Sequence, residues 1–494
     1  MKILSASQIR LADAHTIEHE PVASIDLMER AASACVTWIK KNLSSKNFFK
    51  IFCGPGNNGG DGLAITRLLL DSGFKAEAFI IGGEEKKSPD FLENEKRLKK
   101  IAPGAMHDIH SENDLPAFQK EDCIVDALFG TGLSRPLMGL YAVVIRHINE
   151  HRHKVISIDM PSGLYPDTPA EGHVIVQADH TLSFQVPKLV FMFSESELFA
   201  GQFHVLDIGL DDKYIEGLPS SGNYITKDLF QSFLKPRTRF SHKGKYGHAL
   251  IIAGSKGKMG AAVLAVKGCL RTGAGLVSAR IPETGNNIMQ VSCPEAMIAD
   301  DEIDFEKYTA IGIGPGIGTG DEPAELLKSI LQSAKAPLVL DADALNIISV
   351  EKELLNQLPV NTILTPHPKE FERLAGKSEN GFERHERQLA FSKNHKVIVV
   401  LKGAHTCITT PEGNSYFNST GNAGMAKGGS GDVLTGMITS LLAQKYESLQ
   451  AALLGVFLHG LAGDIAAEKK GMDGMIARDV VNGIPGAWKE MRNR

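Results

Sequence analysis

The chain has 494 residues, 43% of them hydrophobic, which is enough for large buried cores and suggests about two or three domains. Its formal net charge of −5 gives no reason to expect a polyanion, so we expect no nucleic-acid partner. The apolar runs have the length of strands and the first residues lead into a polar segment, so we predict neither a membrane span nor a signal peptide and expect a cytoplasmic protein.

The first half of the chain alternates short β-type runs with helical patterns. A capping-box spacing from Ser5 to Gln8 predicts a first helix, and apolar residues recur at helical spacing over residues 25–41. Strands are predicted over residues 48–53, 76–81, 123–127, 155–158 and 181–184, with a later one near Val205. Strands that alternate with helices predict a parallel, doubly wound sheet, in which ligands bind beyond the carboxyl ends of the strands.

Three of these predicted strands are followed by glycine turns that carry acids or amides. Residues 54–59 formally match the dinucleotide fingerprint G-x-G-x-x-G, but residues 57–61 place two amides and a carboxylate where a redox site uses mainly bare backbone. Residues 126–136 form a second such turn, whose arginine is suited to phosphate, and residues 159–163 form a third. One such turn predicts only a loop or a helix cap, whereas three together predict a binding site.

The amino-acid sequences of these turns are specific enough to compare with known families. They read Asn57-Asn58-Gly59-Gly60-Asp61-Gly62, Asp126 with Gly130-Thr131-Gly132, and Asp159-Met160-Pro161-Ser162-Gly163, and a later strand is followed by Val186-Pro187-Lys188. Together they resemble the NAD(P)H-hydrate epimerase family over about residues 5–210. The resemblance implies a Rossmann-like domain in which the hydrated cofactor is held by Asn57, Asn58, Gly59, Gly60, Asp61, Gly130, Thr131, Gly132, Leu133, Ser134, Arg135, Pro136, Asp159 and Lys188.

The same resemblance implies a potassium ion that Asn58, Asp126 and Ser162 help to bind. The substrate would carry a hydroxyl on the carbon next to the ring nitrogen, so the nitrogen lone pair helps water to leave and water can return on either face. One acid–base group poised over that carbon suffices. We assign this catalytic role to Asp159, with Lys188 as a weaker second candidate.

A polar, glycine-rich and proline-rich stretch separates the two halves, and it predicts a linker over residues 216–226 between domains at residues 1–215 and 227–494. Strands and helices then alternate again, with strands predicted over residues 249–253, 276–281, 310–313, 338–340, 362–364 and 397–401. The two halves share no loop sequences, so we predict a fusion of two doubly wound α/β folds rather than a repeat.

The most informative stretch of the second half is Gly428-Gly429-Ser430-Gly431-Asp432, which follows Asn422 and Lys427 and opens into an apolar helix. Glycines at a helix N-terminus form a nest of N–H donors that can hold phosphate, and an acid at its edge can take a proton from a substrate hydroxyl. The alternative is an ordinary helix start with Asp432 as its cap. Earlier strand ends carry further polar turns at residues 314–318, 341–346, 365–370 and 402–406.

The order of these motifs, Asp341-Ala342-Asp343-Ala344, Thr365-Pro366-His367-Pro368 and then residues 428–432, resembles the ribokinase-like superfamily and, more closely, the nucleotide-dependent NAD(P)H-hydrate dehydratases. The resemblance covers about residues 225–488. It implies that Ala262, Gly316, His367 and Asp432 contact the hydrated cofactor, with Ala261 a close competitor for Ala262. It also implies a nucleotide site formed by Lys402, Gly403, Ala404, His405, Thr406 and Gly431.

Several of these positions also have plain structural interpretations. His367 lies between two prolines and can cap a helix that starts at Pro368. Asp341 and Asp343 can be turn residues, and Lys402 can simply end a strand. The agreement of the whole series favours function most clearly for Asp432.

A kinase-like site suits dehydration because hydroxide is a poor leaving group and a phosphoryl group makes it a good one. Asp432 would accept the hydroxyl proton, and magnesium bound with ADP would neutralise phosphate charge; ATP is the alternative donor. We therefore predict a bifunctional isomerase and lyase that acts on NADHX and NADPHX, has no membrane partner and forms a homo-oligomer. The rival predictions are a small-metabolite kinase in the second half and a non-catalytic binding domain or scaffold in the first.

Overall fold

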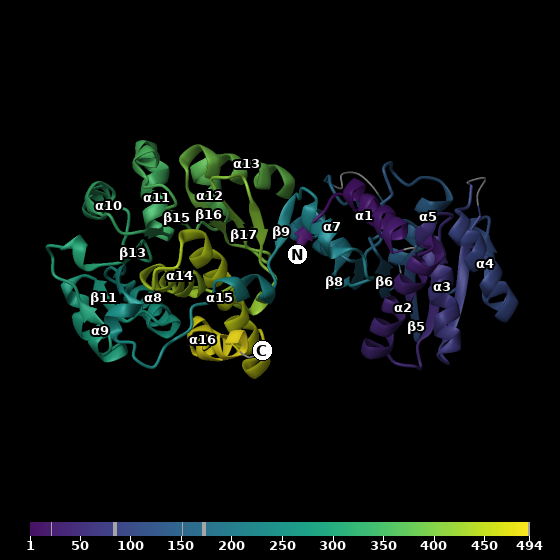
Figure 1. Cartoon of the computed structure of the whole chain (residues 1–494), viewed down its shortest axis with the longest axis horizontal. Coiled ribbons are helices and arrows are strands. Elements are labelled where there is room, and N and C mark those ends of the chain that lie inside the picture. Colours follow the sequence, from purple (N-terminus) through teal and green to yellow (C-terminus); the bar gives the residue numbers. More distant parts are fainter. Residues whose placement is uncertain (21, 83–85, 151, 170–173, 493–494) are drawn as a thin grey trace. The chain divides into compact units, whose positions relative to one another are not determined.

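The computed structural model describes residues 1–20, 22–82, 86–150, 152–169 and 174–492. The chain forms two compact units, shown in Figure 1. Unit 1 comprises Met1–Gly222 with Asn380–Phe382, and unit 2 comprises Asn223–Glu379 with Glu383–Arg494. Each unit contains a mainly parallel sheet with helices on both faces, which confirms the predicted fold class.

The sheet of unit 1 has the order β4-β3-β2-β5-β6-β7-β8, and the neighbouring strands are parallel. Its strands are β2 (Phe48–Cys53), β3 (Lys75–Ile81), β4 (Met106–Ile109), β5 (Asp122–Ala127), β6 (Lys154–Ile158), β7 (His180–Phe184) and β8 (Gln202–Leu206). The helices include α1 (Ala6–His19), α2 (Ser24–Asn42), α3 (Asn57–Asp71), α4 (Pro89–Ile101), α5 (Leu140–Glu150), α6 (Glu197–Ala200) and α7 (Asp212–Gly217). The predicted strands are confirmed, and β4 is an addition that its half-polar sequence did not indicate.

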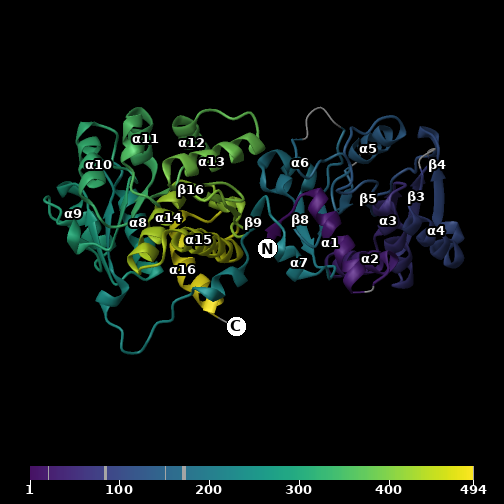
Figure 2. The same ribbon diagram turned by 45° about the horizontal axis from the view of Figure 1, so that its top comes forward.

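Alternate residues of the central strands enter different cores. Phe49 and Ile51 of β2 pack with residues of α2 and α3, whereas Phe52 packs on the other face with residues of α5. Figure 2 shows α2 and α5 as separate layers of this unit. A parallel sheet covered on both faces explains why these strands read as nearly continuous apolar runs.

Strand order creates a crevice in unit 1 between β2 and β5. The chain runs outward from β2 to β3 and β4 and then returns to place β5 on the other side of β2. The loops after β2 and β5 therefore diverge, which is where ligands bind in such sheets. This position brings the predicted turns at residues 54–62 and 126–136 to one place.

Helix α3 begins at Asn57, so residues 57–61 of the first predicted turn are in fact the start of a helix. Its glycines serve close packing. A Cβ on Gly59 would lie 1.8 Å from the Gly54 carbonyl oxygen, and one on Gly60 would lie 2.9 Å from Met28 Sδ. The asparagines and the aspartate are thereby fixed on a helix rather than on a loop.

In unit 2 the sheet runs in the order β9-β18-β17-β16-β15-β14-β13-β10-β11-β12. The parallel strands are β10 (His248–Ile252), β11 (Leu276–Arg280), β12 (Met297–Ile298), β13 (Ala310–Ile313), β14 (Leu338–Leu340), β15 (Ile363–Leu364) and β16 (Ile398–Leu401). Antiparallel β17 (Cys407–Thr409) and β18 (Ser415–Phe417) follow, and β9 (Gly222–Tyr224) pairs in parallel with β18. The short strands β12, β17 and β18 were not predicted because two or three residues carry no readable alternation.

Two cores lie on the two faces of this second sheet. Helices α8 (Met259–Thr272), α14 (Ser430–Ala443), α15 (Ser448–Lys470) and α16 (Ala477–Arg492) share one core with Ala249 and Ile251 of β10. Helices α10 (Asp321–Ser333), α11 (Ala342–Val350), α12 (Pro368–Ala375) and α13 (Gly381–His395) belong to the other side, together with Leu250 and Ile252. The short helix α9 (Asn286–Ser292) contacts α8. The switch of direction falls between β10 and β13.

Helix α15 corrects the expectation that the apolar runs are only of strand length. It has 23 residues and a mean hydropathy of 1.5 in its most apolar window, so by length and composition it could cross a membrane. Within unit 2, however, it packs against α14 and α16, and 72% of that window is buried. Burial of this kind is what the core helix of a folded domain shows, so α15 is weak support for a membrane span.

Candidate active sites

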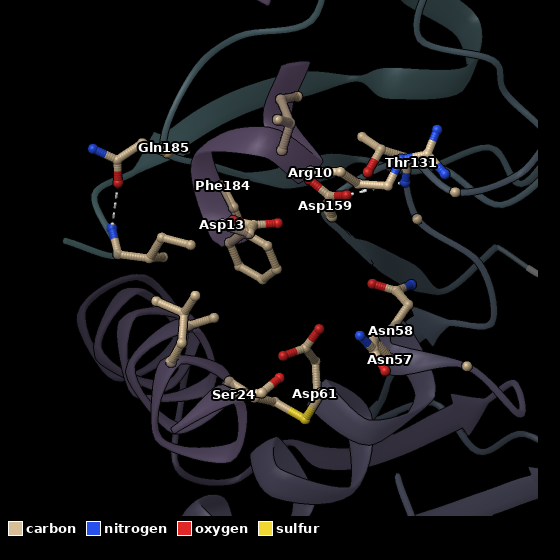
Figure 3. Close-up of a pocket in the computed structure, with 18 of the residues that line it drawn as sticks. Arg10, Asp13, Ser24, Asn57, Asn58, Asp61, Thr131, Asp159, Phe184 and Gln185 are labelled. Carbon is tan, nitrogen blue, oxygen red and sulfur yellow. Dashed lines mark hydrogen bonds between the residues drawn. The ribbon is translucent and has the colours of Figure 1, made fainter. Parts of the chain in front are cut away.

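A cavity of about 560 Å³ lies at the switch point of unit 1. The residues that line it come from α1, α2, α3 and the turns after β2, β5, β6, β7 and β8, and Figure 3 shows many of their side chains. The predicted residues in its lining are Asn57, Asn58, Asp61, Gly130, Thr131, Gly132, Leu133 and Asp159. Ser134, Arg135 and Pro136 are exposed and do not belong to the described lining. The volume is within the usual range for small-molecule sites.

Asp159 follows β6 and has a left-handed backbone with φ of +63°. Aspartate and asparagine adopt this conformation more readily than most residues. One carboxylate oxygen of Asp159 lies 2.9 Å from the Lys188 ammonium, and the other accepts a hydrogen bond of 3.1 Å from the Thr131 backbone N–H. The carboxylate is therefore held in a fixed orientation beside the cavity.

Lys188 is fully buried, and its ammonium is enclosed by acceptors. It donates to Ser183 Oγ at 2.8 Å, to the Phe184 carbonyl at 3.0 Å and to the Val186 carbonyl at 3.2 Å. These bonds, together with Asp159, compensate the cost of burying its charge. In this geometry Lys188 orients Asp159, and it is not among the described residues that line the cavity.

Asp126 and Ser162, two of the predicted potassium ligands, are fully buried and in direct contact. Ser162 donates to Asp126 through both its hydroxyl, at 2.6 Å, and its backbone N–H, at 2.8 Å. Ser157 Oγ and the Leu128 N–H complete the set of neutral donors around Asp126 in the described part of the chain. Burial raises the pKa of Asp126, and these hydrogen bonds oppose that rise.

The uncharged donors and the oxygen atoms around Asp126 are suited to binding a monovalent cation. Among the residues that the structure describes, its hydrogen-bond donors are uncharged, so a bound cation would supply the missing counter-charge. Ser162 also accepts from the Phe129 N–H at 2.9 Å, which fixes the hydroxyl beside the turn at residues 128–131. Hydroxyl, carboxylate and amide oxygens are the donors that hard cations prefer.

Asn58 lies next to this turn and has an unsatisfied polar group. Its Nδ2 is buried and has no hydrogen-bond partner among the described residues. A Cβ on Gly130 would lie 3.3 Å from Asn58 Oδ1 and 2.9 Å from Asp159 Oδ2. Gly130 thus keeps space between the amide and the acid, and a buried donor without a partner is the signature of a ligand site.

Asp61 and Asp13 complete a group of three acids around the cavity (Figure 3). Burial raises the pKa of Asp61 well above its usual value, and Asp159 and Asp13 add to the rise through repulsion. Burial also raises the pKa of Asp13 to about 6; Asp159 adds to the rise and Lys188 opposes it. The sequence analysis missed Asp13 and its neighbour Arg10, for which the only signal was their spacing of three residues on one helix face.

In unit 2, the stretch at residues 428–432 forms the start of α14, as predicted. Gly429 has a left-handed backbone with φ of +93°, and Ser430 is the first helical residue. A Cβ on Gly431 would lie 3.3 Å from Lys402 Nζ, so the lysine ammonium lies directly over the first turn. A cation and free N–H groups at a helix N-terminus make a site for an anion such as phosphate.

Lys402 does more than end β16, because it forms an ion pair with buried Asp341 at 2.8 Å. Thr435 of α14 donates to the other Asp341 oxygen at 2.6 Å, and Glu370 lies 3.9 Å from the Lys402 ammonium. Asp341 is therefore not a simple turn residue. Sequence reasoning missed Thr435 and Glu370 as parts of this cluster.

Asp432 is partly buried in the first turn of α14. Burial raises its pKa to about 6; repulsion from Asp341 and Asp343 adds to the rise, and Lys402 opposes it. A carboxylate in the third helical residue also faces free N–H groups at the helix start. This acid can take up and release a proton near neutral pH.

The turn after β13 lies opposite the start of α8. Gly316 has φ of +67°, and a Cβ there would lie 3.2 Å from Ala261 Cβ and 3.1 Å from Lys258 Cβ. Ala262, the preferred alanine of the sequence analysis, is instead fully buried and faces Gly254. Of the two alanines, it is Ala261 that the structure brings to Gly316.

Asp343 also differs from a plain turn residue. It accepts from the Gly318 N–H at 2.9 Å and lies 3.3 Å from the ammonium of Lys258. It thereby connects the turn after β13 with the segment before α8. These contacts order the glycine turn that precedes α10.

His367 caps α12, as its alternative interpretation predicted. Its Nδ1 accepts from the N–H groups of Lys369 and Glu370, and the His367 N–H donates to Glu370 Oε2 at 2.8 Å. Its side chain remains 45% exposed, so capping leaves one side of the ring open to a ligand. Glu370 joins this cap to Lys402 and hence to the cluster at Asp341.

The remaining predicted residues are Gly403, Ala404, His405 and Thr406, which form the turn between β16 and β17. The Gly403 N–H donates to Thr406 Oγ1 at 3.3 Å, which closes the turn. Asn422 and Lys427 are used structurally: Asn422 donates to Asp464 at 2.9 Å, and Lys427 donates to the Met475 carbonyl at 2.7 Å. Lys427 therefore supports the glycine turn and does not point an unpaired charge at phosphate.

Comparison with known proteins agrees with two catalytic units. Residues 24–190 match the family model described as YjeF-related protein N-terminus, and residues 249–486 match the one described as NAD(P)H-hydrate dehydratase. The chain is similar to the bifunctional NAD(P)H-hydrate repair enzymes of Thermofilum pendens (36% identity, 100% of this chain and 97% of the relative) and Escherichia coli (32%, 96% and 92%). It is also similar to an ADP/ATP-dependent NAD(P)H-hydrate dehydratase from Bacillus subtilis, co-crystallised with ATP/Mg²⁺ (30% identity, 55% of this chain, 99% of that chain, TM-score 0.49). The chain belongs to the family of bifunctional NAD(P)H-hydrate repair enzymes.

Proposed function

We propose that the chain repairs hydrated NADH and NADPH in two steps, with one step in each unit. Unit 1 interconverts the R and S hydrates, and unit 2 dehydrates the S form at the expense of ADP. The observation that carries this proposal is the placement of an acid near a lysine beyond the strand ends of each unit: Asp159 with Lys188, and Asp432 near Lys402. Family membership over the whole chain supports the pairing of the two reactions.

In unit 1, Asp159 is the proposed acid–base group. The hydrate carries a hydroxyl on the carbon next to the ring nitrogen, and the C–O bond breaks as the nitrogen lone pair forms a C=N bond. Asp159 acts on the departing or returning water, and its pairing with Lys188 keeps it oriented for proton transfer. Return of water to the other face gives the other epimer.

The cofactor is proposed to lie in the cavity of unit 1. Asn57, Asn58, Asp61 and the backbone of residues 130–133 line that cavity, and the unpartnered Asn58 amide supplies a donor that a ligand would satisfy. Gly59 and Gly60 support the binding residues through packing. We retain Ser134, Arg135 and Pro136 as contacts for the more distant part of a dinucleotide, since they continue the same turn into solvent.

We also propose a potassium ion at Asn58, Asp126 and Ser162. The support is the buried Asp126, whose donors in the described chain are neutral, together with the adjacent hydroxyl of Ser162. When bound, the ion would balance the charge of Asp126 and order the turn at residues 128–131. Loss of epimerase activity on replacing potassium with a large organic cation, with recovery on its return, would test this.

In unit 2, Asp432 is the proposed base for phosphoryl transfer. It takes the proton of the substrate hydroxyl, whose oxygen attacks the terminal phosphorus of the nucleotide. Lys402 and the N–H groups around Gly431 stabilise the charge on the transferring phosphoryl group. Phosphate then leaves with help from the ring nitrogen, a neighbouring proton is lost, and the reduced cofactor is restored.

The nucleotide is proposed to bind at Lys402, Gly403, Ala404, His405, Thr406 and Gly431, with ADP as the phosphoryl donor. Magnesium, when bound, neutralises charge on the nucleotide phosphates. It is usually held by phosphates with one or two carboxylates, and Asp341 and Glu370 are the carboxylates near Lys402 that fit this requirement. The hydrate is proposed to contact Gly316, His367 and Asp432, and the alanine contact is better placed at Ala261 than at Ala262 because Ala261 faces Gly316.

The test follows the return of reduced-cofactor absorbance from a mixture of R and S hydrates with ADP and magnesium. Wild type is expected to recover all of the cofactor, and Asp432→Asn almost none. Asp159→Asn is expected to recover the S portion at the normal rate and then to slow to the spontaneous rate. Full-speed recovery of both epimers by Asp159→Asn would contradict the two-site assignment.

The alternative function is a small-metabolite kinase with a non-catalytic first unit. Full-length similarity to bifunctional repair enzymes does not favour it. Accumulation of a phosphorylated product, with hydrated cofactor left unchanged, would support that alternative. A cytoplasmic location and a homo-oligomeric state remain proposals, which cell fractionation and sedimentation would test.

A further inference from the structure

Asp13 is an acid in the cavity of unit 1 to which the proposed reaction has so far given no role. It lies on α1, far in sequence from the turns that supply the other polar groups, and lines the same cavity as Asp159. Figure 3 shows the carboxyl groups of Asp13 and Asp159 both turned toward the cavity. Their electrostatic coupling agrees with this proximity, because Asp159 is the largest charged contribution to the pKa of Asp13.

The two acids are treated differently by their surroundings. Asp159 is paired with the Lys188 ammonium at 2.9 Å and accepts from the Thr131 N–H, both of which stabilise a carboxylate. Asp13 has no such partner among the residues that the structure describes, and burial favours its protonated form. The charged groups that face Asp13 are Asp61 and Asp159, with Lys188 behind Asp159 and Arg10 one turn away on α1.

The proposed reaction needs both of these states. The hydroxyl leaves the ring carbon as water only if a group donates a proton to it, and water adds back only if a group removes one. Two acids whose environments separate their protonation states are a recurrent arrangement for paired acid–base catalysis. Asp159, paired with the Lys188 ammonium, is suited to the second task, and a separate proton donor is needed for the first.

We propose that Asp13 is a second catalytic acid–base residue of the epimerase site and acts together with Asp159; this rests on the proposed function of unit 1. In one direction the proton of Asp13 goes to the departing hydroxyl oxygen as the C–O bond breaks, and Asp159 takes a proton from the incoming water as the new C–O bond forms. The enzyme then holds its proton on Asp159, which is the state required for the reverse conversion. Before another conversion in the same direction, Asp159 releases this proton to water and Asp13 takes one up, so that water and protons balance over the full cycle.

Asp61 is the rival for this role, since it also faces the cavity. It is more buried, lies in the second turn of α3, and is repelled by both other acids. Burial and repulsion from these acids favour its protonated form, which suits it to donating a hydrogen bond rather than to cycling between two protonation states. Comparing Asp13→Asn with Asp61→Asn separates the two residues.

The experiment measures conversion of purified R hydrate, coupled to an excess of a separately purified Asp159→Asn chain whose unit 2 removes the S form. Asp13→Asn is expected to lower kcat by about 10²–10⁴-fold with little change in KM. Asp13→Glu should restore part of the rate. Glu18→Gln, at an exposed position on the same helix, is the matched control and should match wild type.

A pH profile gives a readout that a structural role would not move. For wild type, kcat/KM should fall as the pH rises through about 6, where Asp13 loses its proton, and this fall should be absent in Asp13→Asn. Retention of more than a third of the wild-type kcat by Asp13→Asn, or a larger loss in Asp61→Asn, would overturn the proposal. If wild type itself does not convert R hydrate, the proposed function of unit 1 fails instead. If Asp13→Asn melts at a lower temperature than wild type, the kcat of Asp13→Glu becomes the deciding measurement. A kcat for Asp13→Glu no higher than that of Asp13→Asn would contradict a catalytic role for Asp13.

Discussion

Replacing Lys188 with methionine tests how much the buried ion pair between Lys188 and Asp159 stabilises unit 1. Methionine fills much of the same space but removes the ammonium that pairs with Asp159 and bonds Ser183, Phe184 and Val186. Asp159 would then be a nearly buried carboxylate without a counter-charge. Removing one partner of a buried ion pair costs about 3–5 kcal/mol.

The location of Asp159 sets the expected value within that range. Its side chain is 11% exposed toward the cavity, so water can partly solvate the orphaned charge, and we expect a loss of about 3 kcal/mol. For a unit of this size, each kcal/mol lowers Tm by about 2–4 °C, which gives a fall of about 6–12 °C. Adding Asp159→Asn to the variant removes the second charge and leaves only unsatisfied carbonyl and hydroxyl groups, at a cost of about 1–2 kcal/mol.

The assay can observe unit 1 alone. The chain has two tryptophans, Trp38 and Trp488, so a Trp488→Phe background leaves Trp38 in α2 as the only reporter. Thermal unfolding is followed by its fluorescence for wild type, both single variants and the double variant. A Lys188→Met variant that melts within about 2 °C of wild type, or a double variant whose losses simply add, would refute the argument for a stabilising buried pair.

Two further predictions concern Asp61 and Gly316. Because burial raises the folded-state pKa of Asp61 above its unfolded value, ionising this group opposes folding once the pH exceeds the unfolded value; Asp61→Asn should therefore melt higher than wild type at pH 8, with the difference shrinking toward pH 4. Equal melting of the two proteins across this pH range would contradict the burial of a titrating acid. Gly316→Ala should lose about 1–2 kcal/mol because of its left-handed backbone and should weaken hydrate binding in unit 2, whereas Gly320→Ala, at the N-cap of α10 with open space and an ordinary φ, should lose less than about 1 kcal/mol and leave hydrate binding unchanged. Calorimetry and the KM for S hydrate measure these effects, and equal behaviour of both glycine variants would show that the turn tolerates a side chain.

Local pattern was enough to predict most of the parallel strands, with β4 and β12 among the exceptions. The runs at Phe48–Cys53 and Ala310–Ile313 are apolar, short and bounded by glycine, so their ends can be read directly. The start of α3 was misjudged because Asn-Asn-Gly-Gly is typical of a loop, and only the packing of Gly59 against Gly54 reveals a helix. Tertiary packing there overrides local propensity.

The site residues also divide into those that local sequence predicts and those that only tertiary contacts reveal. Motifs within one segment, such as residues 428–432, could be found from the sequence because their members are consecutive. Asp13, Thr435 and Glu370 contribute through contacts with residues far away in the chain. The spacing of residues in the sequence does not predict such contacts. His367 shows a different limit, since one side chain both caps a helix and remains open to a ligand.

The burial of α15 has a consequence for synthesis of the protein. This 23-residue apolar helix shares its core with α16, and residues 477–492 are made after it. Until α16 folds over it, a nascent chain presents an apolar surface that resembles a membrane anchor to targeting factors and chaperones. A ribosome that stalls before residue 477 would therefore release a chain prone to aggregation or mistargeting, although all three proposed catalytic acids had already been made.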